Sequence, residues 1–187
     1  MMGRLIFLLE EPSMKALLDA WLPRLVPGWV AGEHFQCVPH EGKSDLDRSI
    51  PRKLSAWREP GVRFIIVRDN DGADCIATKA HLRKLCEQAG RADTIVRLIC
   101  QELESWYLGD LPALAAAMGT ADIDTPAHRK RYSDPDNGWR KPSLEVKKLA
   151  PSFQKGSGAR AMAVHLSDSG NRSRSFQVFV HTIRAFA

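Results

Sequence analysis

The sequence predicts an α/β fold: a mostly parallel sheet of four or more strands, flanked by helices, with a helical C-terminal extension. Three short apolar runs and one weaker, mixed strand-like segment are each followed by a segment in which apolar residues recur at helical spacing. This alternation of strand and helix is typical of doubly wound sheets. A chain of 187 residues, of which 44% are hydrophobic, has the size and core of one such domain with a modest extension.

The elements follow in order along the chain. Strands are expected over 3–9, 29–38, 64–67 and 94–100, and helices over 12–26, 44–57, 73–89, 106–108, 111–118, 144–149, 159–166 and a last stretch after 171. Pro51 leaves open whether the second helix is one piece or two. We expect an α/β domain over 1–119, a basic and aromatic irregular loop over 120–143, and an extension over 144–187 packed on the same domain.

The composition places limits on compartment and chemistry. No apolar run approaches the roughly 20 residues of a membrane span, and 5–9 is too short for a signal peptide, so we expect a cytoplasmic protein without membrane contact. The four cysteines include no C-x-x-C pair, which favours reduced core thiols over zinc ligands or disulfides.

The net charge of +5 is unevenly distributed. Lys and Arg balance Asp and Glu over 1–143, whereas 144–187 holds seven basic residues against two acidic ones. A polyanionic partner would therefore meet the C-terminal quarter, although a solvated surface without a partner explains the same excess.

Acidic residues follow three of the four predicted strands. They are Glu10 and Glu11, Asp69 and Asp71, and Glu102 and Glu104. Parallel strands place their carboxyl ends at one edge, where open α/β sheets bind ligands, so six carboxylates are expected to gather there. Two carboxylates about 4 Å apart repel by about 4 kcal/mol at an effective dielectric of about 20. Hard oxygen ligands in this number favour Mg²⁺ or Mn²⁺.

Simpler explanations exist for each acidic stretch. The run from Asp69 to Gly72 has the composition of an ordinary polar turn, and a glutamate in a first helical turn is favoured by the helix dipole. A bound divalent ion would instead polarise a phosphoryl oxygen and prepare a nucleophile, which is phosphodiester chemistry. Lys43 is not part of a phosphate loop, because Cys37 occupies the position of the required glycine. It is either a point charge that neutralises phosphate or a solvated lysine.

A second candidate region lies in the predicted loop. Basic residues interleaved with aromatic ones are typical of grooves for single-stranded nucleic acid. The candidates are Arg129, Lys130, Arg131, Trp139, Arg140 and Lys141. Four nearby aspartates nearly cancel their charge, so nucleic-acid contact and a mobile loop both remain open.

Two of these stretches resemble a known family. L-E-E-P-S at 9–13 and D-N-D-G at 69–72 resemble the TOPRIM domain of topoisomerases, primases and overcoming-lysogenization-defect nucleases. A closer resemblance, over nearly the whole chain, is to a TOPRIM-related family of bacterial proteins often encoded beside an ATPase in apparent phage-defence settings. It rests on the order of E-x-P-S, G-K-S-D, D-x-D, E-L-E-x-W-x-L-G-D and N-x-S-x-S-F, which begin here at 10, 42, 69, 102 and 171.

The resemblance implies roles for particular residues. Glu10 takes the place of the TOPRIM glutamate, and Asp69 and Asp71 that of the D-x-D pair that binds Mg²⁺. Glu102 or Glu104 would complete a second metal site. Glu11 stands where TOPRIM proteins usually have glycine, which crowds the loop. The tyrosine of topoisomerases has no counterpart, which argues against strand passage.

Three hypotheses follow from the sequence. The first is a Mg²⁺-dependent nuclease-like enzyme that acts on nucleic-acid phosphodiesters in phage defence with an ATPase partner, with Glu10, Asp69, Asp71 and Lys43 as its catalytic residues. The second is a non-catalytic partner or nucleic-acid-binding module of an ATPase system, in which the acids are structural. The third is a receiver-like phosphoacceptor, although no lysine after a fifth strand is evident.

Overall fold

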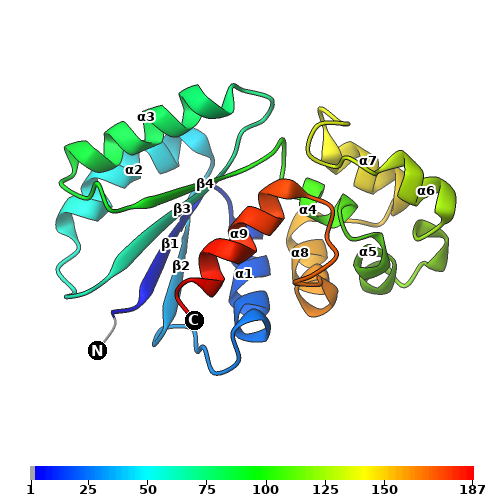
Figure 1. Ribbon diagram of the computed structural model, residues 1–187, viewed down its shortest axis with the longest axis horizontal. Coiled ribbons are helices and arrows are strands. Elements are labelled where there is room, and N and C mark those ends of the chain that lie inside the picture. The colour runs from blue at the N-terminus through cyan, green and yellow to red at the C-terminus, as the bar shows by residue number, and fades with distance from the viewer. Residues whose placement is uncertain (1–2) are drawn as a thin grey trace.

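A computed structural model, which describes residues 3–187, shows four parallel strands in the order β2-β1-β3-β4. They are β1 (Leu5–Leu9), β2 (Phe35–Pro39), β3 (Arg63–Asp69) and β4 (Ile95–Ile99). In the register, Leu5 of β1 lies opposite Phe35 of β2 and Arg63 of β3. The predicted α/β fold with a mostly parallel sheet is therefore confirmed, and all four carboxyl ends point the same way (Figure 1).

Helices cover both faces of the sheet. Helices α2 (Lys43–Ala56) and α3 (Cys75–Gln88) pack on one face, and α1 (Pro12–Leu25) and α9 (Arg174–Arg184) on the other (Figure 1). Side chains of β1 alternate between the two cores: Ile6 and Leu8 lie under α2 and α3, and Phe7 and Leu9 under α1 and α9. Burial on both faces explains why this strand is an unbroken apolar run.

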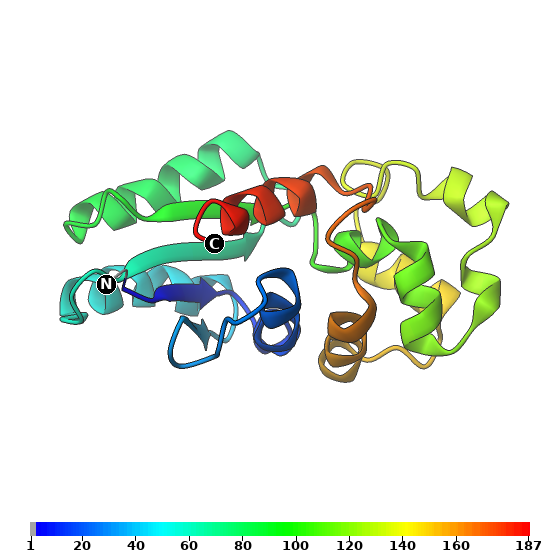
Figure 2. The same cartoon turned by 60° about the horizontal axis from the view of Figure 1, so that its bottom comes forward.

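A helical lobe lies beyond the carboxyl ends of the strands (Figure 2). It contains α4 (Glu104–Leu108), α5 (Leu111–Met118), the 3₁₀ turn η1 (Ala121–Ile123), α6 (Pro126–Arg131), α7 (Pro142–Leu149) and α8 (Lys155–His165). One apolar cluster runs from the sheet into the lobe, and α1 is fixed to α8 by a hydrogen bond from Trp21 Nε1 to the Leu166 carbonyl (3.0 Å). The lobe thus covers the edge at which the acids were expected.

The E-L-E-x-W-x-L-G-D stretch at 102–110 and the N-x-S-x-S-F stretch at 171–176 contact each other. Asn171 donates from its amide to the Trp106 carbonyl (2.8 Å) and accepts from the Ser173 amide (2.9 Å). Buried Asp136 accepts from the Ser173 hydroxyl (2.7 Å) and the Ser175 amide (2.8 Å). The N-x-S-x-S-F stretch therefore caps α9 and holds α4 in place.

Several expected boundaries differ from the structure. β2 begins at Phe35 rather than 29, and α2 continues through Pro51 as one helix. Ile50 and Leu54 on either side of that proline are buried against the sheet, which outweighs the one missing hydrogen bond. The stretch expected to be irregular contains η1 and α6, the latter capped by Thr125. The polar residues of α6 show no apolar periodicity, so the sequence pattern did not predict this helix.

The cysteines match the expected core thiols only in part, because Cys75 is exposed and Cys100 is half-buried. All four cysteines are free thiols, and Cys37 and Cys86 are buried. Within residues 3–187 no helix is both long and apolar enough to cross a membrane.

Candidate functional site

The acids that follow β1 and β3 face each other. Oε2 of Glu10 accepts a hydrogen bond from the backbone N–H of Asp69 (2.9 Å), although 59 residues separate them in the chain. Both side chains are nearly inaccessible, with 8% and 4% of their surface exposed. The parallel sheet therefore brings these two predicted site residues together.

The loop after β3 holds Asp71 in an unusual conformation. Its backbone N–H donates to the Gln101 carbonyl (3.0 Å), and Asn70 Oδ1 accepts from the Gln101 amide (2.6 Å). Asp71 and Gln101 both have positive φ, 47° and 64°. Non-glycine residues seldom adopt this conformation outside constrained sites. The loops after β3 and β4 thus brace each other and fix the direction of the Asp71 side chain.

Two lysines face the acids. Lys43, at the start of α2, forms an ion pair with Asp71. Lys155, at the start of α8, pairs with Glu11 at 3.1 Å, and Glu11 also accepts from the Ser13 hydroxyl. Glu11 therefore has a counter-ion in the position where a glycine was expected. Nothing in the local sequence around Lys155 signals this role, because only the fold brings it to Glu11.

Glu10, Glu11, Asp69 and Asp71 are called the acidic cluster below. Glu104 and Tyr107 extend this cluster into the lobe. Both are 1% exposed, and in residues 3–187 neither Glu104 Oε2 nor the Tyr107 hydroxyl has a hydrogen-bond partner. Burial, assisted by the charges of Glu11 and Glu102 and opposed by the charge of Lys155, raises the pKa of Glu104 to about 7. Burial, and then the charges of Glu104 and Glu11, also raise the pKa of Tyr107.

Burial also raises the pKa of the two acids that meet at the ends of β1 and β3, Glu10 and Asp69. Burial raises the pKa of Glu10 to about 7, against the opposing hydrogen bond from Asp69. Burial, followed by the charges of Glu10 and Glu11, raises the pKa of Asp69 well above its usual range. Burial lowers the pKa of Lys155, but Glu104 and Glu11 outweigh it and raise that pKa above its ordinary value. A buried acid without a partner is stabilised either by a proton or by a cation.

The carboxylate of Glu102 points to the start of α7 rather than to Glu104. Its two oxygens accept from the Ser143 backbone N–H (2.8 Å) and from Lys141 Nζ (3.4 Å). Glu102 therefore accepts a hydrogen bond from a backbone N–H in the first turn of α7, where the helix dipole favours a negative charge. Of the two glutamates expected to assist in metal binding, Glu104 is the one whose carboxylate is left without such partners.

The donor set suits a divalent ion held partly by water. In the part of the chain that the structure describes, no three His, Cys, Asp or Glu side chains form a ready metal cage. Mg²⁺ commonly takes only one or two carboxylates and keeps waters or substrate phosphates as its other ligands. Asp69 Oδ1 is buried without a partner beside Glu10, so these two residues fit such an ion.

Replacing Glu104 by Gln is expected to raise the melting temperature at about pH 8 by several degrees and to change it little near pH 4. With a folded-state pKa of about 7 against an ordinary 4.5, the folded protein keeps a proton that the unfolded chain has lost. The free energy of unfolding therefore falls as the pH rises through this window, and the Gln variant lacks that fall. Fluorimetric melting without divalent ions measures it, with Glu87→Gln, an exposed acid of α3, as control. Parallel curves for wild type and Glu104→Gln would contradict the assignment.

The predicted nucleic-acid residues are mostly engaged within the lobe. Arg129 pairs with Asp124 at 2.6 Å, and Arg131 with Glu145 at 3.1 Å. The Arg131 guanidinium also lies over the Trp139 ring, 4.6 Å from its centroid. In residues 3–187, Lys130 and Arg140 form no ion pair. A base that stacks on Trp139 would have to displace Arg131.

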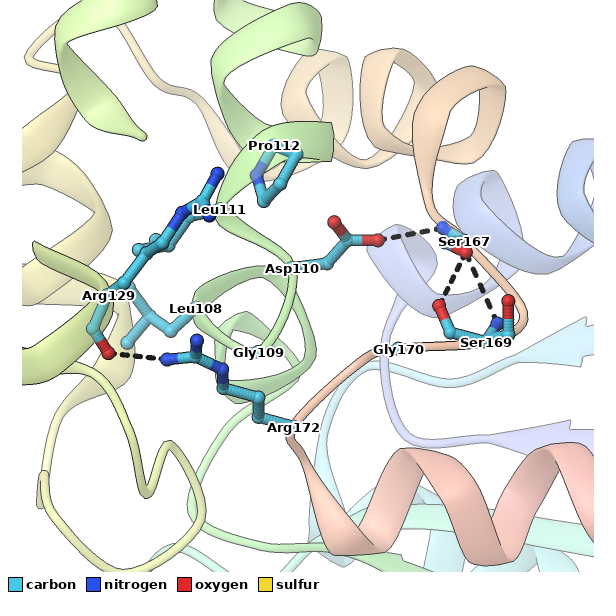
Figure 3. A pocket seen from close by; sticks show the side chains of 10 residues that line it. All are labelled: Leu108, Gly109, Asp110, Leu111, Pro112, Arg129, Ser167, Ser169, Gly170 and Arg172. Atoms are coloured by element: carbon cyan, nitrogen blue, oxygen red, sulfur yellow. Dashed lines mark hydrogen bonds between the residues drawn. The ribbon is translucent and has the colours of Figure 1, made fainter. Parts of the chain in front are cut away.

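A separate cavity of about 360 Å³ lies among α5, α6 and the loop between α8 and α9 (Figure 3). Asp110 there accepts from the Ala113 amide (3.1 Å) and the Ser167 amide (2.8 Å), and Arg172 donates to the Arg129 carbonyl. Its polar groups thus bind one another, and it includes none of the acids described above.

Comparison with known proteins places the chain in a family. The family model of the domain of unknown function DUF4276 matches residues 9–184. No curated protein matches. The C-terminal region of the Burkholderia pseudomallei OLD protein has a similar structure, with a TM-score of 0.56 and 16% identity over 100% of this chain and 99% of that one. The C-terminal region of the Xanthomonas campestris pv. campestris OLD protein gives 0.50 and 13%, over 98% and 97%. At these identities the likeness shows a shared fold, and the family match shows that the chain belongs to the DUF4276 family.

Proposed function

We propose that the protein is a nuclease-like enzyme that uses Mg²⁺ or Mn²⁺ to act on nucleic-acid phosphodiesters. The observation that carries the proposal is the meeting of Glu10 with Asp69, whose buried Oδ1 has no partner in the described residues. A buried, unpartnered carboxylate costs stability unless a proton or a cation neutralises it. Because this carboxylate lies at the ligand-binding edge of a parallel sheet, a functional role is favoured.

Two independent likenesses support this proposal. The sequence resembles TOPRIM domains, among them those of overcoming-lysogenization-defect nucleases, and the fold is shared with C-terminal regions of two OLD proteins. Because those matches are to C-terminal regions, further sequence precedes the matched part in those proteins. The ATPase partner and the phage-defence setting are what the sequence resemblance to the TOPRIM-related family implies, and we include both in the proposal.

The chain's own residues have distinct roles in the proposed chemistry. Asp69 and Glu10, assisted by Asp71, would hold the ion, which would polarise the phosphoryl group when bound. Glu104, with a pKa of about 7, is suited to accept or donate a proton near neutral pH. Lys43 and Lys155 offset the negative charge of the acids and of an approaching phosphate.

Cleavage of labelled single- and double-stranded DNA and RNA tests the proposal. Wild type is expected to cleave at least one of them with Mg²⁺ or Mn²⁺ and to lose activity in EDTA. Asp71→Asn is expected to lower the rate by about 10²-fold or more, the size of losing one charged group that stabilises the transition state. Asp122→Asn, which neutralises an exposed acid of η1, is the matched control and should cleave like wild type. Cleavage that persists in both Asp69→Asn and Asp71→Asn would rule the proposal out.

A second candidate function is a non-catalytic partner or nucleic-acid-binding module of an ATPase system. It is favoured by the two lysine–carboxylate pairs, since Lys43 and Lys155 already compensate Asp71 and Glu11. Calorimetric titration with Mg²⁺ and Mn²⁺ separates the two functions, because this module would show no binding that depends on Asp69. A receiver-like role is less favoured, since the sheet within residues 3–187 has four strands and so lacks the fifth that carries the lysine of such sites.

A further inference from the structure

A cluster of cations lies along the open edge of the sheet. β4 is the last strand in the sheet order and, within residues 3–187, pairs only with β3. It runs between α3 and α9 (Figures 1 and 2). Lys79 and Arg83 come from α3, and Arg97 comes from β4 itself. These three residues are called the β4-edge patch below.

The three cations of the patch lie close together beside the edge strand. Lys79 and Arg83 are one helical turn apart, about 6 Å along the axis. Arg97 donates from Nε to Thr182 Oγ1 (2.6 Å) and from Nη1 to the Val96 carbonyl (3.0 Å), so its guanidinium is held beside the strand. Burial, and then the charges of Arg83 and Arg97, lower the pKa of Lys79, so the three cations act on one another.

The patch lacks compensating acids. In residues 3–187 none of its three members forms an ion pair with a carboxylate, in contrast to Arg129, Arg131 and Lys141 of the lobe. A cation at an open strand also discourages pairing with another strand, and that explains Arg97 alone. It does not explain two further cations on the helix above.

We infer that the β4-edge patch is a docking surface for the phosphate backbone of a nucleic-acid duplex whose neighbouring phosphodiester reaches the acidic cluster. The inference rests on the proposed function. Phosphates on either side of the reacting one would be repelled by Glu10, Asp69 and Glu104, and uncompensated cations on the flank offset that repulsion. Arg97 stands two residues before the end of β4, about 7 Å along the strand from the acidic edge.

The chemistry of the patch favours a duplex over a single strand. Proteins that bind single strands combine cations with aromatic rings on which bases stack. The patch contributes cations and no aromatic ring, which suits backbone contacts that do not depend on sequence.

Fluorescence anisotropy with a short labelled DNA duplex in EDTA tests the inference without cleavage. Lys79→Gln/Arg83→Gln is expected to weaken binding about tenfold at low salt and to reduce the slope of log K against log salt by about 1.8, since each lost phosphate contact contributes about 0.9. Lys53→Gln/Arg58→Gln removes the same charge in the last turn of α2 and just beyond it, at the opposite end of the sheet. This double variant should change the affinity by less than about twofold.

Three results would overturn the inference: no duplex binding by wild type, unchanged affinity in Lys79→Gln/Arg83→Gln, or equal weakening in both double variants. Altered self-association of the free protein in Lys79→Gln/Arg83→Gln, with duplex affinity unchanged, would assign the patch to a protein contact instead. Patch-dependent binding without any metal-dependent cleavage would leave the docking surface standing and refute the proposed function. Metal-dependent cleavage of duplex at the same rate in wild type and Lys79→Gln/Arg83→Gln would support the proposed function and refute the docking surface.

Discussion

Asp69→Asn is expected to slow cleavage strongly and at the same time to make the protein more stable. Loss of a carboxylate that holds the ion should lower the rate by about 10³-fold, which corresponds to about 4 kcal/mol. In the absence of divalent ions at about pH 8, the melting temperature should rise by several degrees, because each kcal/mol is worth about 2–4 °C in a chain of this size.

The reason for the gain is the buried charge. Burial and the charges of Glu10 and Glu11 raise the pKa of Asp69 above its usual range, so the folded state holds a proton that the unfolded chain loses as the pH rises. Stability contributed by this group is therefore lost above the ordinary aspartate pKa, and Asn, of the same shape, has no proton to lose. Thermal melting from acid to about pH 8 measures the difference.

Added metal provides the decisive comparison. Mg²⁺ at about 100 times its Kd should stabilise wild type by about 2.7 kcal/mol and leave Asp69→Asn unchanged. Asp122→Asn should respond to the metal as wild type does. Equal stabilisation of wild type and Asp69→Asn by Mg²⁺ would show that the ion binds elsewhere.

The gathering of Glu10 and Asp69 could be predicted because it depends only on strand direction. Once alternating strands and helices indicate a parallel sheet, the residues after each strand share an edge, whatever their side chains do. The structure places both acids there. The apolar runs also located β1 and β3, since a strand buried on both faces is visible in composition alone.

The direction of each side chain could not be predicted in the same way. Glu102 and Glu104 lie two residues apart, yet one binds the start of α7 and the other is buried beside Lys155. Lys155 reaches Glu11 across 144 residues of sequence, through the packing of α8 on α1. Such contacts arise from tertiary packing, which carries no local signal in either partner.

The contacts of the N-x-S-x-S-F stretch also could not all be predicted from its own residues. Ser173 caps α9, because its side chain accepts a hydrogen bond from the backbone N–H of Phe176. The second task of the stretch, the hold on α4 through Asn171 and Trp106, depends on a glycine in the partner segment. Gly109 has φ −70° and ψ −17°, an ordinary helical conformation, so the need for glycine there is steric rather than conformational.

Gly109→Ala is therefore expected to destabilise the protein by about 2–3 kcal/mol, as overpacking of a closed contact does. A Cβ at this position would lie 2.1 Å from Asn171 Oδ1 and 2.9 Å from the Ser173 nitrogen, so the hold on α4 must open. Urea unfolding followed by tryptophan fluorescence measures the loss, and Trp106 within α4 reports on it directly.

The same substitution at Gly156 supplies the control. This glycine lies in α8, where a Cβ would meet no neighbouring side chain or other segment within 4 Å, so alanine there should stabilise the helix by about 0.5–1 kcal/mol. Asn171→Ala removes the clashing oxygen, and its effect should combine with Gly109→Ala to less than the sum of the two, as expected for residues in contact. Strict additivity, or a Gly109→Ala protein as stable as wild type, would show that the Asn171 contact does not hold α4. In that case the position of Glu104 in the acidic cluster would have to depend on the packing of Trp106 against Phe176 and Phe179 instead.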